Sequence, residues 1–295
     1  MRIRKTWGEI VFLVLVYIFM IALCITILFP FWNIFTLSIT GAGVSTTRFH
    51  FWPPVVTIAN YLRVFDSRHI WVGFGNTLHR TILGTIVTLI FTIHLAYPLS
   101  KRNFPHKNFW TLVIVFTMFF SGGMIPDFIL VRTLGLINNR WAMIIPGLIS
   151  AFNMIIMRNF FMSMPDSLEE SARIDGANDI TILYRIILPL SGSIIATIAL
   201  WTAVGHWNAW FDNLVYMTDA SRIVLQVVLR RVVLEGSQQL INMQGAAAVD
   251  TGLQTITPET IRAATIMVAT VPILCVYPFL QKYFVKGVMV GSLKG

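Results

Sequence analysis

Charged residues are scarce in this sequence: 12% of its 295 residues are Asp, Glu, Lys or Arg, whereas 56% are hydrophobic. A water-soluble domain carries about 25% charged residues, so this chain has too few to cover a water-exposed surface. Long apolar runs fill the sequence instead, and they do not alternate as the strands of a membrane β-barrel do. The composition therefore predicts an all-α integral membrane protein.

Cysteine is also rare, since only Cys24 and Cys275 occur and each lies in an apolar stretch. Two such thiols argue against a disulfide framework and against a zinc site. The phosphate-binding pattern GxxxxGK[ST] is missing, as are HExxH and GxSxG. We therefore expect no cofactor in this chain and no covalent catalysis.

The formal net charge of +9 has two interpretations. Nucleic-acid binding is one, and basic residues that flank membrane spans are the other. The second fits so apolar a chain, and no nucleic-acid partner is expected. At the start, Arg2, Arg4 and Lys5 precede an apolar run over residues 10–31. That run is too long for a signal peptide, so we expect an uncleaved first span.

Six apolar segments are predicted to be membrane spans, within a single transmembrane domain of residues 1–295. The predicted spans are residues 9–35, 71–99, 109–120, 141–161, 186–210 and 263–280. Residues 58–65 are predicted to lie in an outer loop or to form an interfacial helix, and residues 223–234 a short helix. Residues 121–140 are predicted to be irregular and partly helical.

The distribution of lysine predicts the orientation. Six spans place both termini on the same side of the membrane. The total of Lys and Arg does not show which side is cytoplasmic, because about 12 lie on the side of the termini and about 10 on the other. Lysine divides cleanly, because every lysine falls on the side of the termini. These lysines are Lys5, Lys101, Lys107, Lys282, Lys286 and Lys294. We expect both termini and residues 164–190 to lie in the cytoplasm.

Residues 164–190 form a long polar interruption between apolar segments, and they keep a helical periodicity. Gly176 is predicted to end a first helix, and Asp179 to cap a second one that runs to Pro189. Two short helices joined by a glycine elbow at the membrane surface would form a rigid projection. Another protein could bind that projection.

A specific pattern lies within this segment: Glu170-Ser171-Ala172, then Gly176 after three residues, then I-x-L-P over residues 186–189 after nine more. The pattern resembles the EAA loop of binding-protein-dependent ABC importer permeases, which reads EAA, three residues, G, nine residues, I-x-L-P. Ser171 replaces the middle alanine, and serine is nearly as small. An ordinary connection between two spans is the alternative.

The resemblance covers nearly the whole chain and is closest to the carbohydrate-uptake branch. The sequence RIDGA at residues 173–177 and the ending at residues 277–295 look like the second, maltose-type permease subunit. The ending is also similar to that of permeases for complex or uronate-containing oligosaccharides.

The resemblance implies a type I permease with six transmembrane helices in the bacterial cytoplasmic (inner) membrane. A second related permease would pair with it as a heterodimer. Two ATP-binding subunits would bind ATP and Mg and dock on the cytoplasmic loop, and an extracytoplasmic solute-binding protein would deliver an oligosaccharide. The implied docking residues are Glu169, Glu170, Ser171, Ala172, Arg173, Asp175, Gly176 and Ala177.

Polar and aromatic residues of the predicted spans are candidates for the substrate path. Asn76, His94 and Asn153 line that path or bond a neighbouring helix. Trp201 and Trp207 stack on sugars or belong to an aromatic belt at the interface.

Other charged residues have structural alternatives too. His79 and Arg80 line the path or, as we favour, lie near the outer interface and extend their polar ends to it. Four outer residues contact a solute-binding protein or lie in solvated loops. They are Asp127, Arg132, Asp212 and Arg222.

Two other classes of function fit less well. An ion-coupled secondary transporter needs carboxylates within the membrane, and Glu9 is the only acidic residue near a predicted span. A membrane enzyme needs catalytic groups that converge, and none converge in this sequence. An ABC permease for a solute other than a sugar is the nearer alternative.

Overall fold

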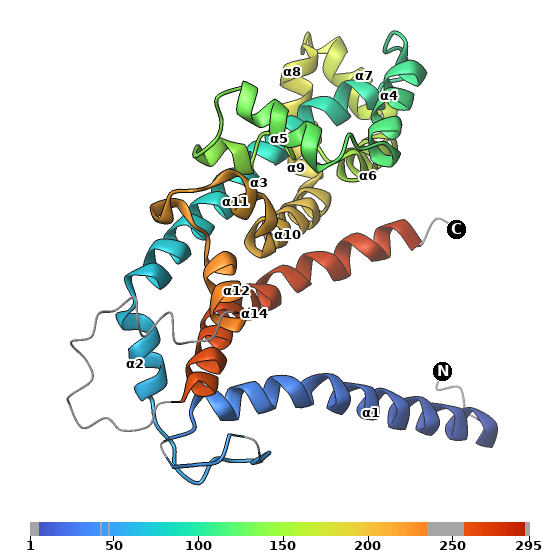
Figure 1. Cartoon of the computed structure of the whole chain (residues 1–295). Coiled ribbons are helices and arrows are strands. Elements are labelled where there is room, and N and C mark those ends of the chain that lie inside the picture. Colours follow the sequence, from blue (N-terminus) through green and yellow to red (C-terminus); the bar gives the residue numbers. More distant parts are fainter. Residues whose placement is uncertain (1–5, 42, 47, 235–256, 293–295) are drawn as a thin grey trace. The chain divides into compact units, whose positions relative to one another are not determined.

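A computed structural model describes residues 6–41, 43–46, 48–234 and 257–292, with side chains described as far as residue 275 in the last range. The described secondary structure is helical (Figure 1), apart from turns and an isolated bridge between Thr40 and Val56. The expected helical class is therefore confirmed. Several expectations concern residues outside this description: Arg2, Arg4, Lys5, Lys294 and the side chains of the ending at residues 277–295.

Two compact units make up the chain, one of residues 1–68 with 229–270 and the other of residues 69–228 with 271–295. Whether these two units act as the single transmembrane domain expected over residues 1–295 stays a prediction.

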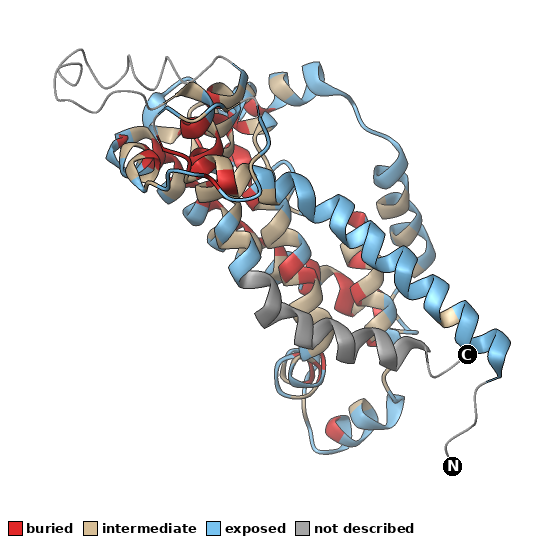
Figure 2. Ribbon diagram, turned by 90° about the horizontal axis from the view of Figure 1, so that it is seen from below, coloured by how far each residue is buried: buried red, intermediate tan, exposed pale blue. Residues whose placement is uncertain are grey.

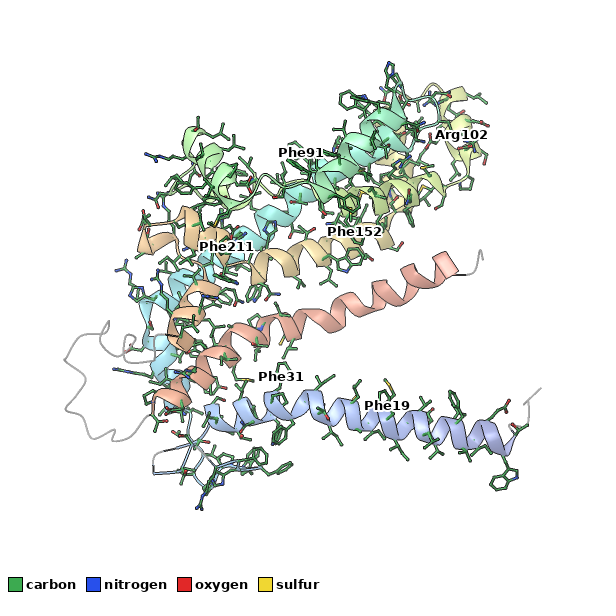
Figure 3. All side chains as sticks on the ribbon, turned by 45° about the vertical axis from the view of Figure 1, so that its right-hand side comes forward. Phe19, Phe31, Phe91, Arg102, Phe152 and Phe211 are labelled. Carbon is green, nitrogen blue, oxygen red and sulfur yellow. The ribbon has the colours of Figure 1, made fainter. Side chains whose placement is uncertain are left out.

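The first unit begins with α1 (Trp7–Ser38), a helix of 32 residues. Thr6 starts it with a capping box, in which the Thr6 hydroxyl accepts from the Glu9 amide and the Glu9 carboxylate accepts from the Thr6 amide. Figure 2 shows α1 exposed along most of its length, and Figure 3 shows Phe19 and Phe31 projecting from it. A helix this long and apolar on all sides fits a membrane span.

A polar joint follows α1 within the same unit. The side-chain amide of Asn60, on α2 (Ala59–Asp66), donates to the carbonyl oxygens of Ser38 at 2.9 Å and Thr40 at 3.0 Å. The Ser38 hydroxyl lies 2.7 Å from that of Tyr61. Of the two alternatives for residues 58–65, the structure shows a helix, α2, and these bonds attach it to the end of α1.

The second unit is built on α3 (Arg68–Ser100), a helix of 33 residues. Its larger remaining helices are α4 (Lys107–Phe119), α5 (Met124–Thr133), α6 (Ala151–Met162) and α10 (Gly192–Asn208). Shorter turns connect them, namely η1 (Arg140–Met143), α11 (Phe211–Tyr216) and η3 (Ala220–Arg222). Two further helices, α12 (Leu225–Leu234) and α14 (Pro258–Ser292), each include residues of both units. The expected short helix at residues 223–234 is confirmed as α12.

Within the described ranges, three helical stretches have the length and composition to cross a membrane: α1, α3 and α14 as far as Cys275. Two bent pairs raise the count to five if each pair is one span: α4 with α5, bent by 113°, and residues 179–190 with α10, bent by 82°. The count of six spans stays a prediction.

Two predicted spans differ from the observed helices. The predicted span at 141–161 is helical only from Ala151, because Pro146 and Gly147 interrupt residues 144–150, and α6 alone is too short to cross. The segment at 186–210 is not one straight helix, since Ser191 separates α9 (Leu188–Leu190) from α10. The predicted span at 109–120 corresponds to α4. Residues 120–123, with Gly123 at φ +90°, separate it from α5, which lies in the stretch predicted to be irregular and partly helical.

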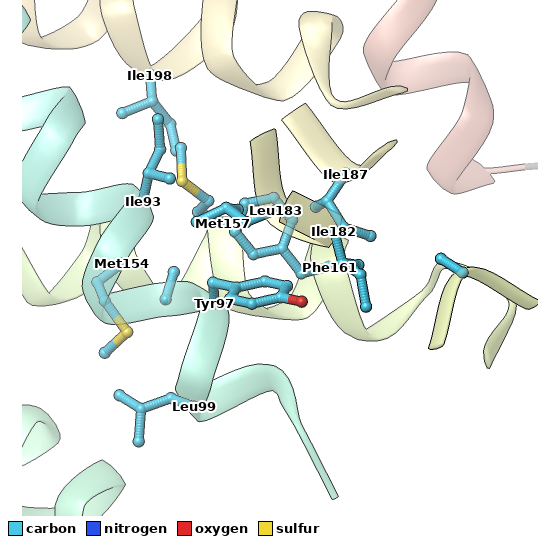
Figure 4. Close-up of a cluster of buried hydrophobic side chains, with 12 residues drawn as sticks. Ile93, Tyr97, Leu99, Met154, Met157, Phe161, Ile182, Leu183, Ile187 and Ile198 are labelled. Carbon is cyan, nitrogen blue, oxygen red and sulfur yellow. The ribbon is translucent and has the colours of Figure 1, made fainter. Parts of the chain in front are cut away.

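The core of the second unit is one cluster of buried apolar side chains. The residues from α6 lie at helical spacing on one face, as do those from α3. The polar segment after α6 contributes four more members, and α10 contributes Ile198. Figure 4 shows the ring of Tyr97 among Met154, Phe161 and Leu183. The buried members are Ile93, Ala96, Tyr97, Leu99, Met154, Met157, Phe161, Ala172, Ile182, Leu183, Ile187 and Ile198.

Candidate functional site

The polar segment at residues 164–190 contains the predicted elbow. Its first helix, α7 (Asp166–Ile174), ends at Asp175, after which Gly176 takes φ +81°. The amide of Ala177 donates to the Ala172 carbonyl at 2.9 Å, and the amide of Gly176 donates to that of Arg173 at 3.0 Å. These two bonds are those of a Schellman motif, which needs a left-handed residue where glycine stands. The predicted break at Gly176 is confirmed.

The second helical run begins one residue earlier than predicted. Asn178, not Asp179, is the N-cap of α8 (Asp179–Ile182), because its side-chain oxygen accepts from the Thr181 amide at 2.8 Å. The Asp179 carboxylate instead accepts from the Arg173 guanidinium at 2.5 Å, across the elbow. Asp175 is the C-cap residue of α7. The prediction that Asp179 is the N-cap was wrong. Asparagine and aspartate are both good N-cap residues, so residue type alone does not distinguish Asn178 from Asp179.

A widened turn, η2 (Leu183–Ile187), follows α8 and leads into α9. In η2 the Leu188 amide donates to the carbonyl of Leu183, five residues back. Pro189 follows directly, and proline has no amide hydrogen for the carbonyl four residues before it. The I-x-L-P part of the pattern thus coincides with a π-type turn.

The eight predicted docking residues divide between two faces of the elbow. Ala172 is 8% exposed and belongs to the core cluster, Ala177 packs against that cluster, and Glu169 is half-buried. The small side chain of Ala172 lets α7 lie close to its own neighbouring helices. The others face outward beside Ile174, which is 86% exposed. These outward residues are Glu170, Ser171, Arg173, Asp175 and Gly176.

Two ion pairs join the inner face of α7 to the residues after α3. The ammonium of Lys101 donates to the Glu169 carboxylate, and it lies 4.0 Å from the centroid of the Tyr97 ring. Arg102 lies 3.2 Å from the carboxylate of Asp166. A groove of about 910 Å³ runs beside these pairs, lined by residues from the end of α3, residues 101–105, α7 and α8.

The predicted substrate-path residues of α3 bond other parts of this chain. The buried Asn76 amide donates to the carbonyls of Ser221 at 2.8 Å and Ile223 at 3.0 Å, and its oxygen accepts from Arg140 at 3.0 Å. His94 is exposed, and its Nε2 lies 2.9 Å from the Tyr184 hydroxyl on η2. Both residues contact neighbouring elements, and contact with a substrate stays a prediction.

The remaining predicted path residues lie on α6 and α10. Asn153 is half-buried in the first turn of α6, where its amide donates to the Ser150 cap at 3.3 Å. The Trp201 ring lies 6.0 Å from that of Phe152, and it is partly exposed. Trp207 is buried edge-on to Phe74, with 5.9 Å between the ring centroids. Of these residues, Trp201 is the most accessible to a sugar.

Arg80 is buried, which contradicts the expectation that it extends to the interface. Its side chain is 4% exposed, and its guanidinium bonds both oxygens of Asp212, one of them at 3.0 Å. It also donates to the carbonyls of Ala209 and Met143, each at 3.3 Å. The opposite charge of Asp212 makes burial of the arginine tolerable. His79 is exposed, as the same expectation required.

A comparison with protein families identifies the chain. The family described as the binding-protein-dependent transport system inner membrane component matches residues 70–290, about three quarters of the chain. The chain belongs to this family. It is thus one of a group of membrane transport components, and the resemblance to such permeases is confirmed.

Two curated relatives of this permease come from Bacillus subtilis (strain 168). Protein LplC is 43% identical over 257 residues, which cover 87% of this chain and 85% of LplC. The polygalacturonan/rhamnogalacturonan transport system permease protein YtcP is 40% identical over 283 residues, covering 95% of this chain and 97% of YtcP.

A solved structure also resembles the permease closely. One chain of a bacterial ABC transporter involved in the import of the acidic polysaccharide alginate superposes with a TM-score of 0.87 and 32% sequence identity. The match covers 96% of this permease and 99% of that chain. The permease therefore shares the helical fold of a known importer subunit.

Sequence reasoning missed two features of the permease. Lys101 was expected to indicate orientation only, yet it contacts Glu169 in the docking segment. Arg80 and Asp212 were considered separately, although they form one ion pair. A charged residue in an apolar span signals a buried partner, but it does not say which residue that partner is.

Proposed function

We propose that this permease is the transmembrane subunit of an ATP-driven importer of oligosaccharides. In this proposal a second, related permease pairs with it, and two ATP-binding subunits dock on residues 164–190 from the cytoplasm. An extracytoplasmic solute-binding protein delivers the sugar. The family description and the names of its relatives support a permease that works with a binding protein and carries carbohydrate.

The geometry of the elbow is the observation that carries the proposal. An ATPase that changes shape does work on a membrane subunit only through a firm joint. The Schellman bonds, the Arg173–Asp179 pair and the buried Ala172 hold α7 and α8 in one arrangement. The outer face then presents Glu170, Ser171 and the exposed Ile174 for docking.

The orientation forms part of the proposal. Lys101 lies against α7, so the polar segment and a lysine-bearing loop occupy the same side of the membrane. Because lysine favours the cytoplasmic side, we place residues 164–190 and both termini in the cytoplasm of a bacterium. Six spans in the inner membrane are consistent with that placement, if the short α6 and the two bent pairs each belong to a span.

The chemistry of ATP belongs to the partner in this proposal. Among the described residues, no three His, Cys, Asp or Glu side chains gather to hold a metal ion. The sequence lacks a phosphate-binding loop. ATP and Mg would therefore bind to the docked ATPase, and the permease would carry out no covalent step.

Uronate-containing oligosaccharides are the substrates we propose. YtcP is named for polygalacturonan and rhamnogalacturonan transport, and the solved relative belongs to an alginate importer. All three of these polymers are acidic. The substrate class is independent of the fold, so the experiment tests it separately from the ATP-driven mechanism.

Uptake by the reconstituted importer tests the proposal. The permease, its partner permease, the ATPase and the binding protein are placed in proteoliposomes with ATP inside. Labelled trigalacturonate, trimannuronate and maltotriose are supplied outside with the binding protein. We expect uptake that needs ATP and the binding protein and that favours the two uronate trimers. Uptake driven by a proton gradient without ATP would reject the ABC mechanism, and preference for maltotriose would reject the acidic class.

A further inference from the structure

We propose that Lys101 is a positioning residue, which fastens α7 to the end of α3 so that a displacement of α7 moves α3 with it. This proposal rests on the proposed function, because it concerns how force from a docked ATPase enters the transmembrane helices. It concerns residues that face the interior of this chain and not the docking surface itself.

The contact of Lys101 with Glu169 is partly shielded from water. The two side chains are 23% and 18% exposed. The ammonium also lies over the Tyr97 ring, at 4.0 Å from its centroid. An ion pair that is partly withdrawn from solvent is weakened less by water and salt, and a cation over an aromatic face gains further attraction. Lys101 is therefore held by α3 on one side and by α7 on the other.

The neighbouring ion pair provides an internal comparison. Arg102 and Asp166 lie 3.2 Å apart, but their side chains are 86% and 64% exposed. Exposed pairs of this kind contribute little, because water and salt screen them. Asp166, Glu169 and Ala172 are spaced three residues apart and lie on one face of α7. Of the two ion pairs on that face, only the one between Lys101 and Glu169 is partly shielded from solvent.

The Lys101 contact continues into the core. The buried Tyr97 ring packs edge-on against Phe161 of α6, with 6.2 Å between centroids. Arg158, also on α6, donates its Nε hydrogen to the carbonyl of Leu99 at 2.9 Å. The end of α3 is thus bound to α6 as well as to α7. A displacement of α7 would act on a packed body and not on a single flexible side chain.

The other half of α3 is fastened as firmly. Asn76 and Arg80 bond residues 209–223 as described above, and the Thr77 hydroxyl accepts from the Leu225 amide at 2.9 Å. About 24 helical residues separate Thr77 from Lys101, a length of about 36 Å at 1.5 Å per residue. One continuous helix therefore links the docking segment to a buried polar network, and Lys101 closes its docking end.

The ratio of solute transported to ATP hydrolysed tests the role of Lys101. In proteoliposomes supplied with trigalacturonate, we expect Lys101→Met to lower this ratio by about threefold to tenfold while ATP hydrolysis continues. Arg102→Met serves as the matched control and should leave the ratio unchanged. Reversal of both charges, in Lys101→Glu with Glu169→Lys, should restore it in part. An unchanged ratio in Lys101→Met would overturn the proposal.

A distance measurement tests the same contact without any substrate. Spin labels at Ser167→Cys on α7 and Ile86→Cys on α3 report their separation in the full-length permease in nanodiscs. Cys24→Ser and Cys275→Ser remove the two native thiols. We expect a narrow distribution of distances that broadens in Lys101→Met but not in Arg102→Met.

The two experiments distinguish the two proposals. If the unmodified importer moves no oligosaccharide with ATP, the proposed function fails, and the label distances still decide whether Lys101 fastens α7. Equal distributions in Lys101→Met and the unmodified chain would refute the fastening role, whatever the solute is.

Discussion

The buried Arg80 forms an ion pair with the half-buried Asp212, although 132 residues separate them in the sequence. Arg80 lies in the first half of α3, and Asp212 lies in the first turn of α11. Four hydrogen bonds hold the guanidinium, two of them to the carboxylate and two to main-chain carbonyls. The pair fixes the stretch after α10 to the middle of the second unit.

Removing the carboxylate should therefore destabilise the permease strongly. Asp212→Asn leaves a buried guanidinium without a counter-charge, and breaking such a pair costs about 3 to 5 kcal/mol. Thermal unfolding in detergent, followed by tryptophan fluorescence, measures the loss. Arg80→Met with Asp212→Leu should recover much of it, because both charges are then gone. Asp219→Asn, at an exposed turn, is the control; equal melting temperatures for Asp212→Asn and this control would contradict the prediction.

Substitution of Gly176 should destabilise the elbow, and the loss of stability should grow with the backbone strain that the new residue introduces. No atom lies within 4 Å of a Cβ built there, but the positive φ penalises any side chain. We expect Gly176→Ala to cost about 1 to 2 kcal/mol and Gly176→Asn to cost less, since asparagine tolerates this conformation. Gly176→Trp adds bulk at the docking face and should abolish both ATPase association and uptake.

Co-purification of the ATPase with each Gly176 variant provides the measurement. Membrane insertion should be normal in all three variants, because the change lies outside the spans. If Gly176→Trp retained the ATPase and normal uptake, residues 164–190 would not be the docking segment.

Gly84 is required because His206 occupies the space beside it. A Cβ at position 84 would lie 2.5 Å from Nε2 of His206, so the imidazole on α10 would have to move. We expect Gly84→Ala to destabilise the fold by about 1 to 3 kcal/mol, the usual cost of overpacking. The measurement is again the melting temperature in detergent.

Gly75, on the same helix, provides the matched control for Gly84. Nothing lies within 4 Å of its Cβ position, so Gly75→Ala should be neutral or stabilise α3 by about 0.5 to 1 kcal/mol. His206→Ala should relieve the effect of Gly84→Ala. Additive effects of these two substitutions would show that the side chains do not meet.

The turn at Asp219 should loosen at low pH. The amide of Ser221 donates to the Asp219 carboxylate at 2.9 Å, and this bond lowers the pKa of Asp219 below its ordinary value of 3.8. A carboxylate with a lowered pKa contributes its stabilisation above the unfolded value and loses it as the pH falls through the folded value. Hydrogen exchange at Ser221 should therefore accelerate, beyond the intrinsic pH effect, at acidic pH. Asp219→Asn should remove that extra dependence.

Part of this fold follows from local sequence. The apolar lengths of α1, α3 and α14 predict helices that can cross a membrane, and Gly176 predicts the elbow, because each depends on residues close together in the chain. The interruption between α4 and α5 also follows from its local glycines, but the break at Ser191 and the angles of both bends do not. An apolar run has the same composition whether its helix is straight or broken.

The contacts that secure the candidate site are not local, and the sequence could not supply them. Lys101 and Glu169 are 68 residues apart, and either would pass for an ordinary charge at the membrane surface. Asn178 and Asp179 are adjacent residues of equal capping ability, so only the geometry of the turn selects between them.

Because Leu183–Ile187 form a π-type turn, the number of residues between the elbow and α10 determines how α10 is rotated. One residue more or fewer there would rotate everything downstream by about 100° around the helix axis. The indole rings of Trp201 and Trp207 would then face different surroundings, with no change in their own sequence. The length of this segment is therefore constrained as strictly as the identity of any of its side chains.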